Sequence, residues 1–205
     1  MLARPGRSEA STDPRSAPPP SFGLRWLWQY LQDSPRPYIL DCGPIRSATL
    51  RILLGRSGRL YSGDLISSHK RPELWDRTRK TPVFRTELLL AGLPPVPAAS
   101  LSVVFCWHLL DLLPREALPD VLLHIHKLME SGGVLFCLLR EPRLEKGADS
   151  AWELDGLTGL ARAHDGVAAF PYPALSNREI DRLLPTGSVK TFLTRSGWRE
   201  VLVLK

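Results

Sequence analysis

Residues 38–67, YILDCGPIRSATLRILLGRSGRLYSGDLIS, form the most informative stretch of this sequence. The stretch begins with an apolar run that ends at Asp41, passes through a turn at Gly43, and continues with apolar residues at helical spacing. A second strand-like run, Arg59 to Ser62, is followed by Asp64. Strand, glycine turn, helix, strand and acid follow one another in this order in a βαβ nucleotide-binding unit.

Two features of this stretch point in different directions. Asp64 follows Gly43 by 21 positions, about where a carboxylate would accept hydrogen bonds from a ribose. By contrast, Ile45 and Ser47 stand where further glycines would let a ligand approach the bare backbone. Without a ligand, Asp41 would cap its turn and Asp64 would cap the next helix.

The composition is that of one globular domain. The chain has 205 residues, of which 43% are hydrophobic and 23% charged. Its cysteines, Cys42, Cys106 and Cys137, are odd in number and form no CxxC pair, so we expect a reducing, cytoplasmic location without zinc or disulfides. No apolar run approaches the roughly 18 residues of a membrane span.

The formal charge of +6 permits an acidic partner without requiring one. Residues 70–80 hold five bases and two acids, so +3 of the surplus lies there. Such a segment, Lys70–Lys80, is usually a solvated helix face, and contact with nucleic acid is the less favoured interpretation.

Residues 1–20 are rich in Ser, Pro, Ala and Arg and are predicted to be a disordered tail. They lack the apolar segment of a signal peptide. A helix is expected from Ser21, with Phe22, Trp26 and Tyr30 at spacing four. We expect this aromatic stripe to belong to the core and the helix to cover the edge of the sheet.

The next part of the chain alternates between helices and strands. We predict helix from Asp64 to about Lys80, a third strand at Val83–Glu87, and a central buried strand at Leu101–Cys106. A helix over Leu118–Glu130 is expected to stop at the glycines that come after it, before a buried strand at Val134–Leu139.

The C-terminal part departs from this alternation. Residues 141–175 are irregular and predict an elaboration over the top of the sheet, where open α/β folds place their sites. Ser176 and Glu179 form the sequence of a capping box, which opens a short helix to Leu184. Two strands, 189–194 and 198–204, joined by a turn, predict a terminal antiparallel hairpin.

The run from Tyr38 to Lys205 resembles the class I S-adenosylmethionine-dependent methyltransferases of the type 11 kind. Residues 39–43, ILDCG, resemble the family's first motif, and residues 61–67, YSGDLIS, its second. LSVVFCWHLLDLLP, residues 101–114, is similar to the family's fourth strand and the segment directly after it. The resemblance implies an α/β, Rossmann-like class I methyltransferase fold with helices on both faces. Residues 21–205 would form this single domain.

The resemblance also implies S-adenosylmethionine as cofactor, bound by Asp41, Gly43, Asp64, Cys106 and Trp107. In an open crevice, Gly43 would form the floor, Asp64 would point inward, and Cys106 and Trp107 would line the opposite wall.

The sequence also departs from the family pattern. Besides Ile45 and Ser47, Leu89 replaces an acid that binds the adenine amino group, and Leu101-Ser102 replaces Phe-Asp. In a closed crevice, Ile45 would fill the cofactor's place. We favour the open form.

No catalytic residue is clear, and none is required, because methyl transfer from a sulfonium needs mainly alignment. His108 and Asp111, three residues apart, are candidates for a base and the group that orients it. A structural histidine is the commoner alternative. His124 and His126 lie two apart on a helix, so they cannot form a metal pair, and no metal site is predicted.

The sequence alone leaves three hypotheses open. The first is a methyltransferase acting on a small molecule or a macromolecule, with residues 141–175 shaping the acceptor site. The second is a methyltransferase-like pseudoenzyme that works as a scaffold or as a regulatory protein-binding domain. The third, weaker hypothesis is an α/β domain that binds another nucleotide.

Overall fold

The computed structural model describes most of the chain: residues 20–34, 36–78, 80–142, 152–163, 170–183, 187–194 and 198–205. The predicted N-terminal tail lies outside these residues except for Pro20, which forms an isolated bridge with Gly159. The turn predicted at residues 195–197 also lies outside them.

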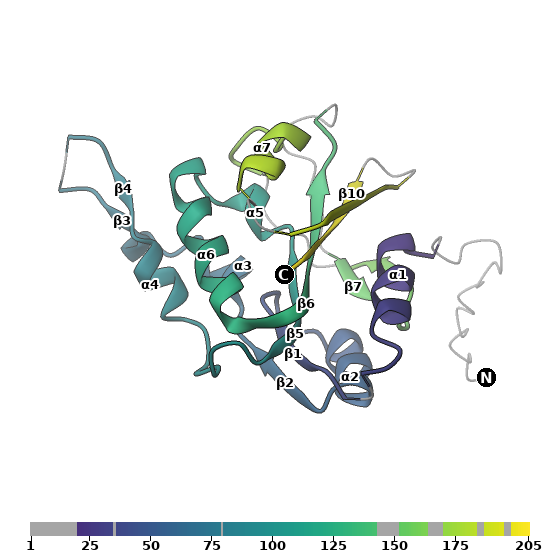
Figure 1. Ribbon diagram of the computed structural model, residues 1–205. Coiled ribbons are helices and arrows are strands. Elements are labelled where there is room, and N and C mark those ends of the chain that lie inside the picture. Colours follow the sequence, from purple (N-terminus) through teal and green to yellow (C-terminus); the bar gives the residue numbers. More distant parts are fainter. Residues whose placement is uncertain are drawn as a thin grey trace, which may run out of the picture.

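A six-stranded sheet forms the centre of the described structure (Figure 1). In spatial order its strands are β2 (Arg59–Ser62), β1 (Tyr38–Asp41), β5 (Leu101–Trp107), β6 (Met129–Arg140), β10 (Trp198–Leu204) and β9 (Val189–Leu193). The first four are parallel, and β10 runs antiparallel to both β6 and β9. The predicted mainly parallel sheet with a C-terminal antiparallel hairpin is confirmed.

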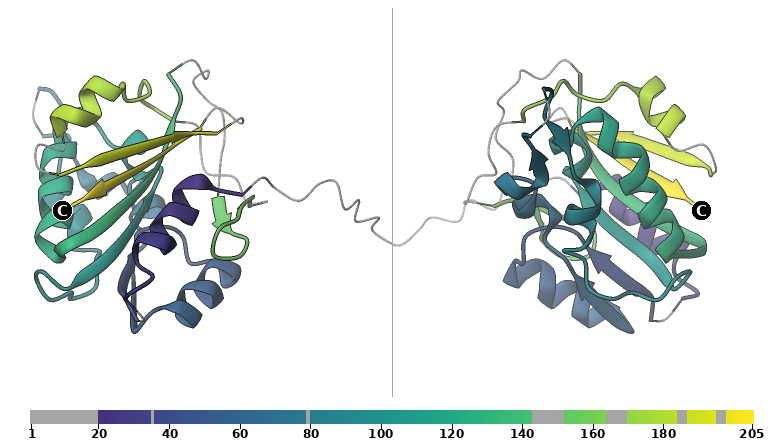
Figure 2. Two further views of the ribbon diagram at one scale, coloured as in Figure 1. Left: turned by 45° about the vertical axis from the view of Figure 1, so that its right-hand side comes forward. Right: turned by 90° about the vertical axis from the view of Figure 1, so that its left-hand side faces the viewer.

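Helices cover both faces of this sheet (Figure 2). α1 (Phe22–Tyr30) and α2 (Ser47–Arg56) lie on one face, and α1 packs against β10 and β9. α4 (Thr86–Leu90) and α6 (Leu118–Leu128) lie on the other face, in contact with each other. Every residue of β5 is buried, as expected for a central strand covered on both sides.

The aromatic stripe of α1 joins the core only through Trp26, which is half-buried against it, contrary to the prediction for Phe22 and Tyr30. Phe22 is 58% exposed and Tyr30 41% exposed, whereas Leu24 and Leu27 are fully buried. The buried face continues through Trp28, so it lies beside the stripe of spacing four and has the i, i+3, i+4 pattern. The predicted helix start is confirmed, since the Oγ of Ser21 accepts a hydrogen bond from the backbone of Leu24.

The predicted third strand at Val83–Glu87 forms only at Val83–Phe84, and it lies outside the main sheet. The helix predicted from Asp64 to about Lys80 is also much shorter than expected. The helix after Asp64, α3, ends at Ser68, and a 3-10 turn, η2 (Pro72–Leu74), comes after it. β3 (Trp75–Asp76) and β4 (Val83–Phe84) then pair with each other outside the main sheet, and α4 begins at Thr86. Pro72 cannot donate to a continuing helix, and Trp75 packs edge-on against Phe84 with ring centroids 5.2 Å apart, which favours the small ribbon.

The region between β5 and β6 contains three helical segments: α5 (Leu109–Leu112), η3 (Arg115–Ala117) and α6. The predicted helix over Leu118–Glu130 ends two residues early, and β6 begins at once with Met129. The glycines expected to stop the helix lie inside β6. A Cβ atom on Gly133 would come within 2.7 Å of the Leu101 carbonyl oxygen, so Gly133 serves the close approach of β5 and β6.

Within residues 141–175, the described parts after Pro142 lie in two places. β7 (Trp152–Leu154) and β8 (Leu160–Arg162) form a hairpin on the side of α2, where the backbone N–H of Leu154 donates to Thr49 Oγ1. Residues 170–175 lead to α7 (Asn177–Leu183). Its predicted capping box is confirmed, because the Glu179 N–H donates to Ser176 Oγ at 3.2 Å and the Ser176 N–H donates to Glu179 Oε2 at 2.8 Å.

Candidate functional site

The residues predicted to bind a cofactor lie at the carboxyl edge of the parallel strands. Asp41 ends β1 and Gly43 comes just after it, Asp64 comes just after β2, and Cys106 and Trp107 end β5. β1 lies between β2 and β5, so the three strand ends are adjacent. The chain turns to one side of β1 to make β2 and returns on the other side to make β5. Open α/β sheets bind ligands at such a switch point.

The Trp107 side chain packs against Gly43 at this switch point. Its Nε1–H donates a hydrogen bond of 2.7 Å to Asp41 Oδ1, which also accepts from the Gly43 N–H at 2.9 Å. A Cβ atom on Gly43 would come within 2.7 Å of two indole atoms. The indole also stacks on Phe105, with centroids 5.6 Å apart, and Trp107 is 3% exposed. The indole therefore occupies the space directly over Gly43.

Trp107 adopts a backbone conformation that is costly for a bulky residue. Its φ of 49° lies in the left-handed region, at a cost of about 1–3 kcal/mol. The hydrogen bond to Asp41 and the stacking on Phe105 hold it there. Strain of this kind, at the edge where α/β sheets bind ligands, supports a functional hypothesis for Trp107.

Asp41 is a buried carboxyl group with an altered pKa. Burial raises its pKa from 3.8 to about 6, although the hydrogen bonds from Trp107 and Gly43 oppose the rise. The nearby charge of Asp64 raises it further. Asp41 therefore changes charge near pH 6, well above the range of an exposed aspartate, and its charge is sensitive to the groups beside it.

Asp64 caps the short helix α3. Its Oδ1 accepts a hydrogen bond of 2.8 Å from the backbone N–H of Ser67. The side chain is only partly buried, and a carboxylate oxygen accepts more than one hydrogen bond. The cap alone would explain an aspartate here, and it does not prevent contact with a ligand.

The loop after Gly43 does not close the crevice in the way that one hypothesis required. Ile45 is 69% exposed, so it does not fill the space over Gly43. The loop after β2 is covered instead, since a Cβ atom on Gly63 would come within 2.8 Å of Leu93 and 3.1 Å of Pro94. The side chain that closes the switch point is Trp107.

Cys106 lies inside the sheet, between the cysteines of the two neighbouring strands. It is fully buried, and its thiol is hydrogen-bonded with Cys42, just after β1, and with Cys137 in β6. These bonds to Cys106, together with burial, raise the pKa of Cys42 and Cys137 well above the usual value. Cys106 therefore packs in the core and does not line an open wall opposite Asp64.

His108 lies in an aromatic environment beyond the end of β5. Its ring is edge-on to Phe170 at 5.6 Å and to Trp198 at 6.5 Å, and the residue is 2% exposed. Burial lowers the pKa of His108 to about 3, and the charges of His69 and Arg46 act in the same direction. Neither ring nitrogen has a hydrogen-bond partner among the described residues. The imidazole is thus a neutral group able to accept a proton only from a close and strong donor.

Asp111 is hydrogen-bonded and ion-paired with Arg140, and the expected pair of His108 with Asp111 is not formed. Asp111 Oδ2 accepts a hydrogen bond of 2.7 Å from the Arg140 backbone and lies 3.7 Å from its Nε. Burial raises the pKa of Asp111, and the N–H and charge of Arg140 oppose this. The guanidinium of Arg199 donates to the Arg140 carbonyl oxygen at 2.8 Å. Arg140 and Arg199 are each 1% exposed.

Sequence reasoning missed these two arginines. The available signal was a charged residue within each of two strongly apolar strands, Val134–Arg140 and Trp198–Leu204. A buried arginine needs several acceptors, and here they come from carbonyl oxygens of distant segments, including Tyr172 and Leu175. Those partners could not be identified before the fold was known.

Cavities among the described residues lie apart from this site. One, of about 450 Å³, lies between α6, α7, β6 and β10, and another, of about 260 Å³, lies near Arg71 and Leu88. None of the candidate residues lines either cavity. The described part of the chain contains no group of three or more potential metal ligands. It also contains no helix long and apolar enough to span a membrane.

Comparison with known proteins gives matches among solved structures. A methyltransferase from Burkholderia thailandensis, solved with 1,6-didemethyltoxoflavin and S-adenosylhomocysteine, matches 90% of this chain and 79% of its own at 14% identity and a TM-score of 0.48. An S-adenosylmethionine-dependent methyltransferase from Methanosarcina mazei matches 88% and 96% at 13% identity and a TM-score of 0.43. One from Mesorhizobium loti matches 90% and 88% at 10% identity and a TM-score of 0.40.

No protein-family model and no curated protein sequence matches the chain. The assignment of fold therefore depends on the sheet itself. Four parallel strands, an antiparallel pair that closes them at the C-terminus, and helices on both faces (Figure 2) give this chain the Rossmann-like α/β fold that the sequence predicted.

Proposed function

We propose that this chain is an S-adenosylmethionine-dependent methyltransferase that acts on a small molecule or a macromolecule. The observation that carries the proposal is the convergence of Asp41, Gly43 and Asp64 at the switch point of the sheet. Two carboxylates at neighbouring strand ends, with a glycine beside one of them, suit a ligand that bears a ribose and an ammonium group. Asp64 would hold the ribose, and Gly43 would lie beneath the ligand.

These groups suit the cofactor in kind, but the indole of Trp107 lies over Gly43. Binding therefore requires the indole to leave. Asp41 would exchange its bond from Trp107 Nε1 for one from the ligand, and the movement would let the backbone of Trp107 leave its left-handed conformation. The bound cofactor supplies a methyl group on a sulfonium, and the protein contributes mainly alignment.

The second candidate function is a methyltransferase-like domain that binds no cofactor and acts as a scaffold or regulatory protein-binding domain. A specific observation favours it as well. Trp107 fills the switch point with its polar atom satisfied, and Ile45 and Ser47 replace two motif glycines. Under this alternative the indole is a permanent part of the core.

Calorimetric titration with S-adenosylmethionine and S-adenosylhomocysteine separates the two candidates. We expect Trp107→Gly to bind more tightly than the wild type, because it empties the crevice and suits the positive φ. Asp64→Ala should weaken binding by about 10- to 150-fold through loss of charged hydrogen bonds. If the ligand binds in the crevice, Asp64→Ala should weaken binding in the Trp107→Gly variant as well.

Circular dichroism establishes that each variant is folded before titration. If neither the wild type nor folded Trp107→Gly binds at millimolar ligand, the methyltransferase proposal fails and the scaffold function stands. If Asp64→Ala binds as well as its parent, the proposed position of the ribose is wrong.

A further inference from the structure

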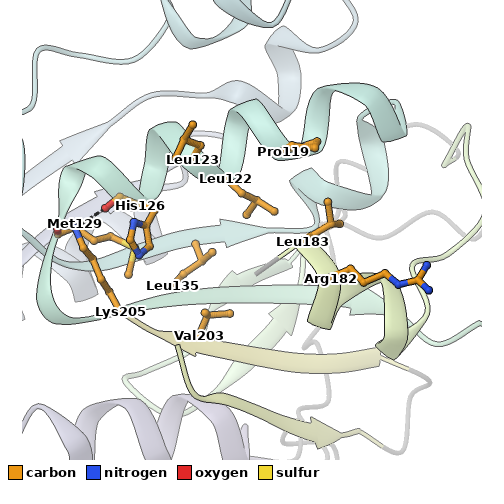
Figure 3. A pocket seen from close by; sticks show the side chains of 10 residues that line it. All are labelled: Pro119, Leu122, Leu123, His126, Met129, Leu135, Arg182, Leu183, Val203 and Lys205. Carbon is orange, nitrogen blue, oxygen red and sulfur yellow. Dashed lines mark hydrogen bonds between the residues drawn. The ribbon is translucent and has the colours of Figure 1, made fainter. Parts of the chain in front are cut away.

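A groove of about 450 Å³ lies on the sheet face covered by α6 (Figure 3). Its walls come from α6 and α7, and its floor from β6 and β10. Ligand sites of small molecules commonly have about 300–1,000 Å³. None of the residues at the switch point contributes to this groove, so it is independent of the proposed cofactor site.

The body of the groove is apolar. Leu122, Leu135 and Val203 are each no more than 5% exposed and form its inner surface. Leu123, on the outer side of α6, is 53% exposed. When an alkyl chain covers such an apolar groove and the exposed leucine at its rim, apolar surface is removed from water, and this burial favours binding.

One end of the groove is cationic. Lys205 Nζ donates hydrogen bonds to the carbonyl oxygens of His126, at 2.8 Å, and Met129, at 2.7 Å (Figure 3). These bonds fix the ammonium at the C-terminal end of α6 and use two of its three donors. Burial lowers the pKa of His126, and the charge of Lys205 lowers it further. An anion placed beside Lys205 would meet a preorganised positive charge.

The other end of the groove is apolar. Pro119 and Leu183 line it, and the guanidinium of Arg182 points away from the groove (Figure 3). The groove thus offers one charged anchor and an apolar channel leading away from it. This asymmetry matches an amphipathic molecule with a single negative head.

We propose that the groove binds a medium-chain monocarboxylate of the fatty-acid type. The carboxylate lies at Lys205, where it accepts a hydrogen bond from the remaining N–H of the ammonium group. The alkyl chain runs along α6 over Leu135 and Val203 towards Pro119. The net charge of +6 favours the approach of such an anion.

The sequence provides a selective probe for this groove. The chain contains two methionines, Met1 and Met129, and Met129 lines the groove. In protein labelled at the methionine methyl groups, we expect octanoate, decanoate and dodecanoate to shift the Met129 signal saturably, with assignment by Met129→Leu. Each added methylene should tighten binding about three- to fourfold until the channel is filled. Decan-1-ol should bind more weakly than decanoate, because it lacks the charge.

Two leucines of similar exposure provide a matched pair of variants. Leu123 on α6 is 53% exposed, and Leu54 on α2, outside the groove, is 57% exposed. Leu123→Glu should weaken decanoate binding by about tenfold or more, because it removes apolar contact and adds a like charge. Leu54→Glu should leave it unchanged.

Three results would overturn the proposal: an unchanged Met129 signal at millimolar decanoate, equal binding of decan-1-ol and decanoate, or equal losses in the two glutamate variants. Titration with S-adenosylmethionine is a separate measurement, so failure here leaves the proposed methyltransferase function untouched.

Discussion

At the scale of single residues, Trp107 and Asp41 control the switch point together. Trp107 holds a strained φ of 49° while its indole donates to Asp41 Oδ1. Asp41 is 5% exposed, so its negative charge is costly when nothing cationic lies beside it. The hydrogen bond serves both residues: it lowers the cost of the buried charge and fixes the indole over Gly43.

The pKa of Asp41 predicts a measurable pH dependence of stability. Because this pKa is about 6 in the folded protein and 3.8 in the unfolded chain, the folded state binds the proton more tightly. The resulting stabilisation is complete below pH 3.8 and is lost as the pH rises through 6. Asp41→Asn keeps an acceptor for Trp107 and carries no charge. We therefore expect its free energy of unfolding, relative to wild type, to rise between pH 4 and 6, by up to about 3 kcal/mol.

Urea unfolding at several pH values measures this difference. Asp181→Asn, at an exposed position on α7, serves as the control for removal of a surface charge. A constant difference between Asp41→Asn and wild type from pH 4 to 8 would contradict the assigned burial of the carboxyl group.

The sequence identified which residues lie at the candidate site, but it did not show that a side chain fills the crevice. Asp41, Gly43 and Asp64 could be placed because strand ends and glycine turns leave local patterns. The indole over Gly43 could not, because its position depends on a single backbone dihedral of Trp107 and on contacts with Phe105 in the assembled sheet. Neither has a counterpart in periodicity or spacing.

At the scale of elements, close approach decides where glycine is required. In α2, a Cβ atom on Gly55 would meet nothing within 4 Å, whereas in β6 a Cβ atom on Gly133 would lie 2.7 Å from one carbonyl oxygen and 3.0 Å from another. The predicted helix stop at Ser131 to Gly133 was wrong because these residues lie inside β6, where Gly133 allows the approach of β5. The pattern of two glycines after a helix is the same whether they cap the helix or let two strands approach.

This contrast predicts opposite effects of the same substitution. Gly55→Ala should stabilise the protein by about 0.5–1 kcal/mol, because alanine favours the helix and restricts the unfolded chain. Gly133→Ala should destabilise it by about 2 kcal/mol or more, because backbone atoms of β5 and β6 must move apart. Thermal unfolding of the two single variants and of their combination checks both signs. Destabilisation by Gly55→Ala, or tolerance of Gly133→Ala, would contradict this difference in packing.

At the scale of the whole molecule, the central strands could be predicted because buried parallel strands are continuous apolar runs. Leu101–Trp107 and Val134–Leu139 are of this kind, and both lie at the centre of the sheet. The predicted third strand, Val83–Glu87, is short, and three of its five residues are polar. Its two strand residues pair with Trp75 and Asp76 instead, outside the main sheet.

This difference in placement predicts a difference in local stability. β3 and β4 form a ribbon of two residues on each side, held by the contact of Trp75 with Phe84 and by an ion pair of 3.4 Å between Arg85 and Asp76. Such a ribbon opens without disturbing the six-stranded sheet, whereas the amides of β5 exchange only when the sheet itself opens.

In hydrogen exchange measured by mass spectrometry, peptides covering residues 75–84 should take up deuterium at the earliest times. Peptides covering Leu101–Trp107 should remain protected for orders of magnitude longer. Trp75→Ala should accelerate exchange in the ribbon and leave β5 unaffected. Equal protection of the two segments would mean that the ribbon belongs to the same cooperative unit as the sheet, contrary to its separate pairing.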